Sequence, residues 1–232
     1  MTASSRQVSA NQVRKAGEVV RKASRGGSDG LSALRDAVDL IDSYRNLFKR
    51  PLVTANNGLR SMVRTLKLDG QVTQRLKRMQ TILDKLEREP RLSLDRMQDI
   101  GGCRVVVPSV DDVYQLVHHF KTVRPIHRES DYIAQPRSSG YRGVHLIVDY
   151  GRPPRRIEIQ VRTKWMHVWA TTVEDISAAR GINYKMDGDA PMQCFLECYP
   201  RLLVYRERNE PVPGTLVMEY SQLMEEAFWE ES

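Results

Sequence analysis

The chain has 232 residues, of which 41% are hydrophobic, and it carries a formal net charge of +7 with three cysteines. This length suffices for one α/β domain with helical attachments or for two very small domains. No apolar run reaches membrane-spanning length and the first residues lack the apolar core of a signal peptide, so we expect a cytoplasmic protein with no membrane partner. The excess of positive charge favours anionic partners such as nucleotides, RNA or acidic proteins.

The first third of the chain has the apolar spacing of helices. We expect helices over about residues 9–24, 30–48 and 57–66, with Pro51 stopping the second of them. Their basic faces are most often simply solvated. We assign residues 1–69 to an N-terminal helical region that packs on the domain or covers its active site.

Two short segments then combine cations with a carboxylate. An extended segment over residues 70–77 places Arg75 and Lys77 on one face, where they could bind a polyphosphate or form an exposed basic edge strand. A helix that begins at Thr81 follows. Asp99 precedes two glycines and an apolar strand, and glycine lets a ligand or another backbone come close.

The middle of the chain continues with a helix and a loop between strands. We expect a helix over residues 110–121 and interpret its two histidines as surface or interface residues rather than metal ligands. A polar loop that begins at Asp131 leads into two strands, over about 144–150 and 156–162. Alternation puts Glu158, Gln160 and Arg162 on one face of the second strand, although a half-buried strand with a solvated outer face would show the same pattern.

The last third is expected to be helical. Trp165 and Trp169 share one face of a helix over residues 164–180, which favours a role in the core. Further helical or mixed segments follow over about 193–207 and 215–229. Cys194 and Cys198 lie one helical turn apart, and we interpret them as two thiols rather than half of a metal site. We assign residues 70–187 to the central domain and 188–232 to a C-terminal helical extension.

The ordered motifs from Gly70 onward, over about half of the chain, resemble the synthetase domain of the RelA/SpoT alarmone synthetase family. The resemblance is to single-domain small alarmone synthetases and to their toxic relatives in toxin–antitoxin systems. It rests on an R-x-K element, a lysine in the next helix, an aspartate before an arginine-containing strand, a glycine-tyrosine loop with a nearby histidine, and a strand of the form E-x-Q-x-R-T. The matching residues are Arg75, Lys77, Lys85, Asp99, Arg104, Asp131, Tyr132, Ile133, Pro136, Arg137, Gly140, Tyr141, His145, Glu158, Gln160, Arg162 and Thr163.

The resemblance implies both a fold and a reaction. The expected fold is α+β or α/β, a nucleotidyltransferase-like mixed sheet of about five strands flanked by helices, with helical extensions at both ends. The implied enzyme is a Mg²⁺-dependent pyrophosphokinase that transfers the β,γ-pyrophosphate of ATP to the 3′-hydroxyl of GDP or GTP. From the residues alone, the carboxylates and cations indicate only that metal-dependent nucleotide chemistry is plausible, because no Walker P-loop is present.

Residue roles follow from the resemblance as expectations. Asp99 and Glu158 would be the catalytic carboxylates and would hold Mg²⁺. The residues implied for ATP binding are Arg75, Lys77, Lys85 and Arg104. The residues implied for the acceptor are Arg137, Tyr141, Arg142, His145, Gln160 and Arg162. Arg137 stands where many members have lysine, and Gly143 replaces a commoner serine, which could widen the acceptor site.

Two alternatives to alarmone synthesis stay open at this point. Some toxic relatives pyrophosphorylate the 3′ end of tRNA, and the basic N-terminal helices are compatible with that acceptor. A non-catalytic RNA-binding module would retain the same fold, although the intact carboxylates at positions 99 and 158 argue against it. An antitoxin protein and a homo-oligomer are further possible partners.

Overall fold

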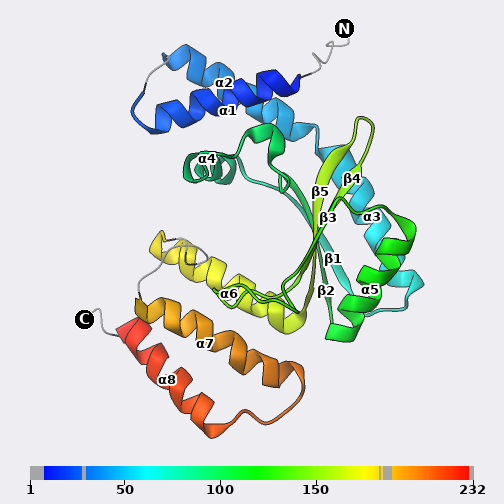
Figure 1. Ribbon diagram of the computed structural model, residues 1–232, viewed down its shortest axis with the longest axis vertical. Coiled ribbons are helices and arrows are strands. Elements are labelled where there is room, and N and C mark those ends of the chain that lie inside the picture. The colour runs from blue at the N-terminus through cyan, green and yellow to red at the C-terminus, as the bar shows by residue number, and fades with distance from the viewer. Residues whose placement is uncertain (1–7, 28–29, 183, 185–189, 230–232) are drawn as a thin grey trace. The chain divides into compact units, whose positions relative to one another are not determined.

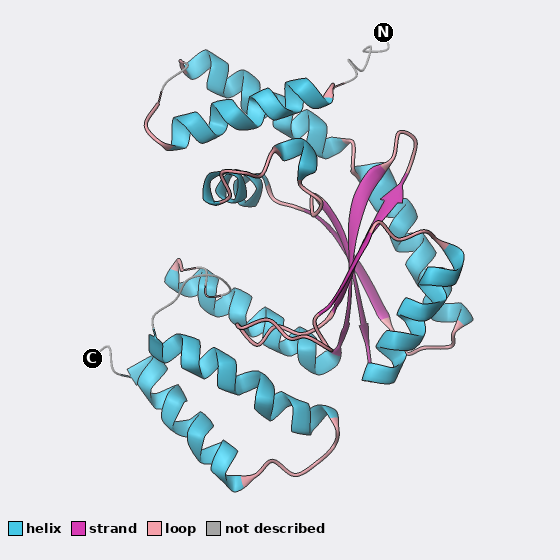
Figure 2. Cartoon of the chain, in the orientation of Figure 1, coloured by secondary structure: helices cyan, strands magenta, loops and turns pink. Residues whose placement is uncertain are grey.

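The computed structural model describes residues 8–27, 30–182, 184 and 190–229 (Figure 1). Helices and strands alternate through the central part, and helices dominate both ends (Figure 2). The helices are α1 Ala10–Ser24, α2 Leu31–Asn46, α3 Lys49–Thr65, α4 Met79–Arg88, the short 3-10 helix η1 Leu94–Arg96, α5 Val110–Val123, α6 Lys164–Arg180, α7 Ala190–Glu207 and α8 Gly214–Trp229. The strands are β1 Gln71–Leu76, β2 Gly101–Val107, β3 Arg128–Asp131, β4 Val144–Tyr150 and β5 Arg155–Thr163.

The strands form one five-stranded sheet in the order β1-β2-β5-β4-β3. This sheet confirms the expected mixed sheet of about five strands flanked by helices. The turn between β4 and β5 is short enough only for an antiparallel pair. On β5 the apolar residues Ile157, Ile159 and Val161 are buried, as the alternation predicts. The polar strand β3 was not predicted, because its sequence RESD has no apolar alternation.

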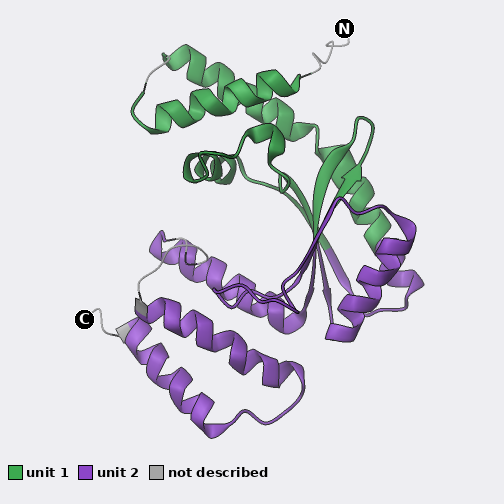
Figure 3. Ribbon diagram, viewed as in Figure 1, with its two compact units in different colours: residues 1–59, 73–103, 147–159 green, residues 60–72, 104–146, 160–232 purple. Residues whose placement is uncertain are grey.

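The chain divides into two compact units, each built from several segments (Figure 3). The first unit comprises residues 1–59, 73–103 and 147–159. Within it α1 packs against α2, α4 and η1. Helix α1 comes close to η1 at Gly17, where a Cβ would lie in van der Waals contact, 3.4 Å from Leu94 Cβ.

The second unit comprises residues 60–72, 104–146 and 160–232. Helix α7 packs against α6 and α8, and the apolar faces of these helices enclose a core that includes Trp169, Val173 and Tyr184. Trp165 and Ile176 are partly buried against this core. The interpretation of the tryptophan face of α6 as core is therefore confirmed.

One helix boundary was wrong. Pro51 does not stop the second helix: α2 ends at Asn46, and α3 begins at Lys49 rather than near residue 57. Proline fits the first turn of a helix, where its missing N–H would have no intrahelical acceptor in any case.

Among the described residues, no helix is both long enough and apolar enough to span a bilayer. The division at residues 69 and 187 stays a prediction, and its second boundary lies outside the described residues.

Candidate functional site

A carboxylate that binds two lysines lies in the first unit. Lys77 Nζ is 2.8 Å and Lys85 Nζ 3.1 Å from Asp99 Oδ2. Burial alone would raise the pKa of the Asp99 carboxyl, but the two ammonium groups together lower it below its usual range. Asp99 is therefore ionised at neutral pH. Its other oxygen, Oδ1, is buried and accepts no hydrogen bond from any described residue.

Local backbone structure places these three groups together. Lys77 directly follows β1, and its N–H donates to the carbonyl of Ile100 at 2.8 Å, which extends the β1–β2 pairing to the neighbour of Asp99. Lys85 lies on α4, whose Ile82 and Leu86 are buried. The helix therefore anchors its apolar face and presents Lys85 to Asp99.

Strand β2 begins with the two glycines after Asp99 and pairs with β5. A Cβ at Gly101 would lie 2.7 Å from Ile157 Cδ1, and one at Gly102 would lie 3.7 Å from the carbonyl oxygen of Glu158. The close approach expected at these glycines is therefore made at Gly101, by a neighbouring side chain, whereas the contact at Gly102 has an ordinary van der Waals length. The pairing of β2 with β5 places the segment of Asp99 beside that of Glu158, which is half-buried on β5. Arg75 is exposed on β1, an edge strand of the sheet.

The donor atoms in this unit fit Mg²⁺. This ion usually binds one or two protein carboxylates and completes its shell with water and substrate phosphates. Among the described residues, no group of three or more His, Cys, Asp or Glu side chains could hold a metal by itself. Asp99 Oδ1 supplies a buried anionic oxygen, and Glu158 offers a second carboxylate from the adjacent strand.

The second unit brings together four residues expected to bind the acceptor. The hydroxyl of Tyr141 lies 2.5 Å from His145 Nε2 and accepts a hydrogen bond from Arg162 Nε at 3.0 Å. Arg162 also donates to Gln160 Oε1 at 2.7 Å. The polar face expected on β5 is therefore not a solvated surface at Arg162, which is buried.

Aromatic rings surround this network. Tyr141 is only 6% exposed, and its ring contacts that of Trp169 at a centroid distance of 6.0 Å. Tyr132 lies edge-on to both Tyr141 and His145. Arg137 is exposed, places its guanidinium 4.3 Å from the centre of the Tyr132 ring and donates to the Tyr132 hydroxyl at 2.7 Å. Tyr132 belongs to the matched motif, but no role had been assigned to it.

Arg142 binds Glu207, a residue that the sequence analysis did not single out. Its NH1 donates to Glu207 Oε2 at 2.9 Å, and the hydroxyl of Thr163 donates to Glu207 Oε1. Glu207 ends α7, 65 positions from Arg142, so no local sequence pattern could have linked the two.

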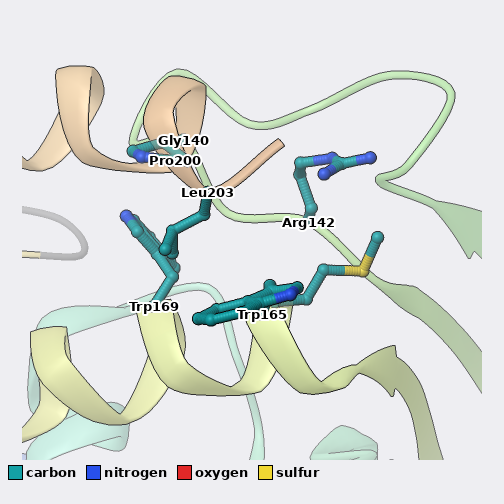
Figure 4. A pocket seen from close by; sticks show the side chains of 7 residues that line it. Gly140, Arg142, Trp165, Trp169, Pro200 and Leu203 are labelled. Carbon is teal, nitrogen blue, oxygen red and sulfur yellow. The ribbon is translucent and has the colours of Figure 1, made fainter. Parts of the chain in front are cut away.

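A small pocket lies between α6, α7 and the loop before β4 (Figure 4). Its lining residues are Gly140, Arg142, Trp165, Met166, Trp169, Pro200 and Leu203. Arg142 therefore contributes to the lining of this pocket and also donates to Glu207.

Arg104 begins a segment of the second unit, whereas the other residues implied for ATP belong to the first unit. It is half-buried on β2. Burial lowers the pKa of the neighbouring His167, and the positive charges of Arg104 and Arg162 lower it further. His167 is a second residue near the expected site that the sequence reasoning did not single out.

The motifs in these two clusters define the class of the protein. A family model described as "Region found in RelA / SpoT proteins" matches residues 74–189, half of the chain. The chain belongs to this family.

Relatives and solved structures agree with that assignment. The chain is 37% identical over 131 residues to GTP pyrophosphokinase YjbM of Bacillus subtilis, a match that covers 52% of this chain and 59% of the relative. This chain therefore spans about three fifths of the length of YjbM and of a second relative, GTP pyrophosphokinase YwaC of Bacillus subtilis. Small alarmone synthetase 1 of Bacillus subtilis superposes with a TM-score of 0.58 at 27% identity, over 72% of this chain and 94% of that one. Small alarmone synthetase 2 of the same organism has a TM-score of 0.63 at 22% identity, with the same coverage of 72% and 94%.

Proposed function

We propose that the protein is a Mg²⁺-dependent pyrophosphokinase that transfers the β,γ-pyrophosphate of ATP to the 3′-hydroxyl of GDP or GTP. The observation that carries the proposal is the grouping of Lys77 and Lys85 on Asp99, whose second oxygen is buried without a described partner. The names of the relatives and their shared family support the same reaction.

The donor side of the reaction would use the cluster in the first unit. Asp99 and Glu158 would hold Mg²⁺, which would offset the negative charge of the phosphates. The phosphates of ATP would compete with Asp99 for Lys77 and Lys85, so both lysines would change partner when ATP binds. Phosphoryl-type transfer needs mainly such positioning and charge stabilisation.

The acceptor side would use the cluster in the second unit. His145, Gln160 and Arg162 would orient the nucleotide, and Arg137 would contribute positive charge beside the Tyr132 ring. Glu158 would accept the proton of the attacking 3′-hydroxyl, whose oxygen would bond to the β-phosphorus of ATP as AMP leaves. Stacking of the acceptor base on Tyr141 stays a prediction. Most of the Tyr141 ring is covered by other residues, and its hydroxyl is already hydrogen-bonded to two residues of the cluster.

The direct test is a transfer assay with γ-labelled ATP and, separately, GDP, GTP or deacylated tRNA. Glu158→Gln should abolish transfer and leave the melting temperature near that of the wild type, because the change is nearly isosteric but removes the charge. Glu87→Gln, at an exposed position on α4, is the matched control and should retain activity. Near-normal turnover by Glu158→Gln would mean that Glu158 is not the catalytic carboxylate.

A second candidate acceptor is the 3′ end of tRNA. The observation that favours it is the row of exposed cations on α1, which includes Arg14, Lys15 and Lys22. Such a surface could bind the phosphates of an acceptor stem. An antitoxin partner would accompany this alternative, and both it and a homo-oligomer stay predictions. A protein that binds RNA but transfers no label to any acceptor would instead be the non-catalytic module.

A further inference from the structure

Two arginines from the N-terminal helices bind the backbone next to the two lysines that hold Asp99. Arg21 is on α1 and Arg45 on α2, both outside residues 74–189 that match the family model. We propose that Arg21 and Arg45 form an arginine clamp that positions Lys85 and Lys77 for the phosphates of ATP. This inference rests on the proposed function and assigns a role in it to the N-terminal helices.

Arg45 holds the backbone of Lys77. Its Nε donates to the carbonyl oxygen of Lys77 at 2.7 Å, and its NH1 lies 3.1 Å from Asp42 Oδ1, one turn earlier in α2. Asp42 is itself held by Asn46, whose Nδ2 donates to Asp42 Oδ2 at 2.9 Å. The N–H of Lys77 is bonded to Ile100, so the clamp completes the pairing of both backbone polar groups of Lys77.

Arg21 holds the end of the helix that carries Lys85. Its Nε donates to the carbonyl oxygen of Leu86 at 2.9 Å, and its NH2 donates to that of Leu92 at 2.5 Å. The intrahelical donor for Leu86 would be the N–H four residues later, but that residue is Pro90, which has none. Arg21 therefore supplies the bond that Pro90 cannot, directly beside Lys85.

The two lysines need this support because they are like charges that share one carboxylate oxygen. Lys77 is buried, so its ammonium group depends on a well-placed anion for its solvation. When ATP replaces Asp99 as the partner of the lysines, their backbones must already be in place for both ammonium groups to reach phosphate oxygens. A displacement of about 1 Å at such a group can cost about a hundredfold in rate.

The test uses the whole chain and two arginine-to-methionine variants. Arg45→Met and Arg21→Met keep most of the aliphatic length and remove the donors. Calorimetric titration with a nonhydrolysable ATP analogue and Mg²⁺ should show about tenfold weaker binding in each variant. In steady-state transfer assays the KM for ATP should rise similarly, while the KM for GDP should stay within about twofold.

Two control variants separate positioning from general stability. Arg35→Met removes an exposed arginine of α2, the helix that carries Arg45, and should leave ATP affinity unchanged. Arg45→Lys can still donate one bond to the Lys77 carbonyl and should restore most of the affinity, which keeps the proposal testable if a methionine variant does not fold.

The outcomes distinguish the clamp from the reaction it serves. Clamp variants with a lowered melting temperature but unchanged affinity for the ATP analogue would overturn the clamp and leave the proposed function intact. A wild-type protein that binds the analogue but transfers no pyrophosphate would overturn the proposed function, and the binding data would still decide the clamp. A wild-type protein that binds no ATP would overturn both.

Discussion

Glu207 is a buried carboxylate on which two segments of the second unit depend. Its side chain is 5% exposed and pairs with Arg142, which is 18% exposed, and it also accepts from Thr163 at the junction of β5 and α6. The Glu207→Gln substitution would remove the negative charge that neutralises the largely buried Arg142 guanidinium. We expect the free energy of unfolding, measured by urea denaturation, to fall by roughly 1–3 kcal/mol.

An ion pair between α7 and α8 provides the control for this change. Glu219 on α8 pairs with Arg201 on α7, but there the side chains are 42% and 56% exposed. Exposed pairs contribute less than about 1 kcal/mol, so Glu219→Gln should change the unfolding free energy little. Equal losses in the two variants would show that the burial of the Arg142–Glu207 pair has no effect of its own.

The sequence predicted the buried face of strand β5, while the roles of its polar residues in the site stay predictions. Glu158, Gln160 and Arg162 follow from the alternation on β5. The pattern could not show that Arg162 and Tyr141 are buried. The core around Tyr141 includes Phe195 and Leu196 of α7, which lie far away in the sequence. Nor could the pattern identify Arg21 or Arg45, whose bonds are to backbone carbonyls that any residue would offer.

At the scale of elements, amphipathic spacing identified the helices but not all of their ends. Residues 47 and 48 separate α2 from α3, and Pro51 lies inside the next helix because a first turn tolerates proline. Strand β3 lacks any apolar signal and belongs to the sheet only through its pairing beside β4. Boundaries and polar edge strands depend on tertiary neighbours, which local patterns do not contain.

The loop before β4 is constrained by a glycine that touches α7. Gly140 has φ +82°, and a Cβ there would lie 2.5 Å from Pro200 Cγ and 3.3 Å from the carbonyl oxygen of Leu196. Gly140→Ala would therefore combine left-handed backbone strain of about 1 kcal/mol with a steric clash that must displace α7 or the loop. We expect a loss of roughly 2–4 kcal/mol in unfolding free energy, since overpacking adds about 1–3 kcal/mol.

Gly181 isolates the backbone part of that cost. It ends α6 with φ +67°, and a Cβ there would meet nothing within 4 Å. Gly181→Ala should thus lower the unfolding free energy by only about 1 kcal/mol, the same backbone strain as at Gly140. If the two alanine variants melt at the same temperature, the contact between Gly140 and α7 does not constrain the loop. A clash that displaces Arg142 should also weaken acceptor binding in Gly140→Ala alone.

At the scale of the whole molecule, the two sets of expected substrate residues fall largely into different compact units. Lys77, Lys85, Asp99 and Glu158 belong to the first unit, and the residues expected to bind the acceptor belong to the second. Strand β5 supplies Glu158 to one and Gln160 to the other, so a single strand links the proposed donor and acceptor residues. The sequence contained this link in the E-x-Q-x-R-T motif, but it gave no sign of the division into units.

The basic N-terminal surface can be tested with residues that are not already used elsewhere. Arg21 binds two carbonyl oxygens, so reversing its charge would damage α4 and could not report on RNA binding. Arg14 and Lys15 are exposed on α1, and we expect Arg14→Glu with Lys15→Glu to impair transfer to tRNA while sparing transfer to GDP. The physical reason is that each phosphate contact releases counterions, so affinity for tRNA should fall steeply with salt and less steeply in the variant.

The control for this last experiment keeps the change in net charge the same. Arg64 and Lys67 are exposed near the end of α3, and Arg64→Glu with Lys67→Glu alters the total charge as much as the α1 reversal does. If the net charge attracted tRNA over a long range, both double variants would lose tRNA transfer equally. If tRNA binds a local surface on α1, only the reversal of Arg14 and Lys15 should impair transfer. Transfer to tRNA that is insensitive to salt and to both reversals would refute the basic-surface account. The absence of any labelled tRNA product, alongside labelled product from GDP, would leave the guanosine nucleotide as the acceptor.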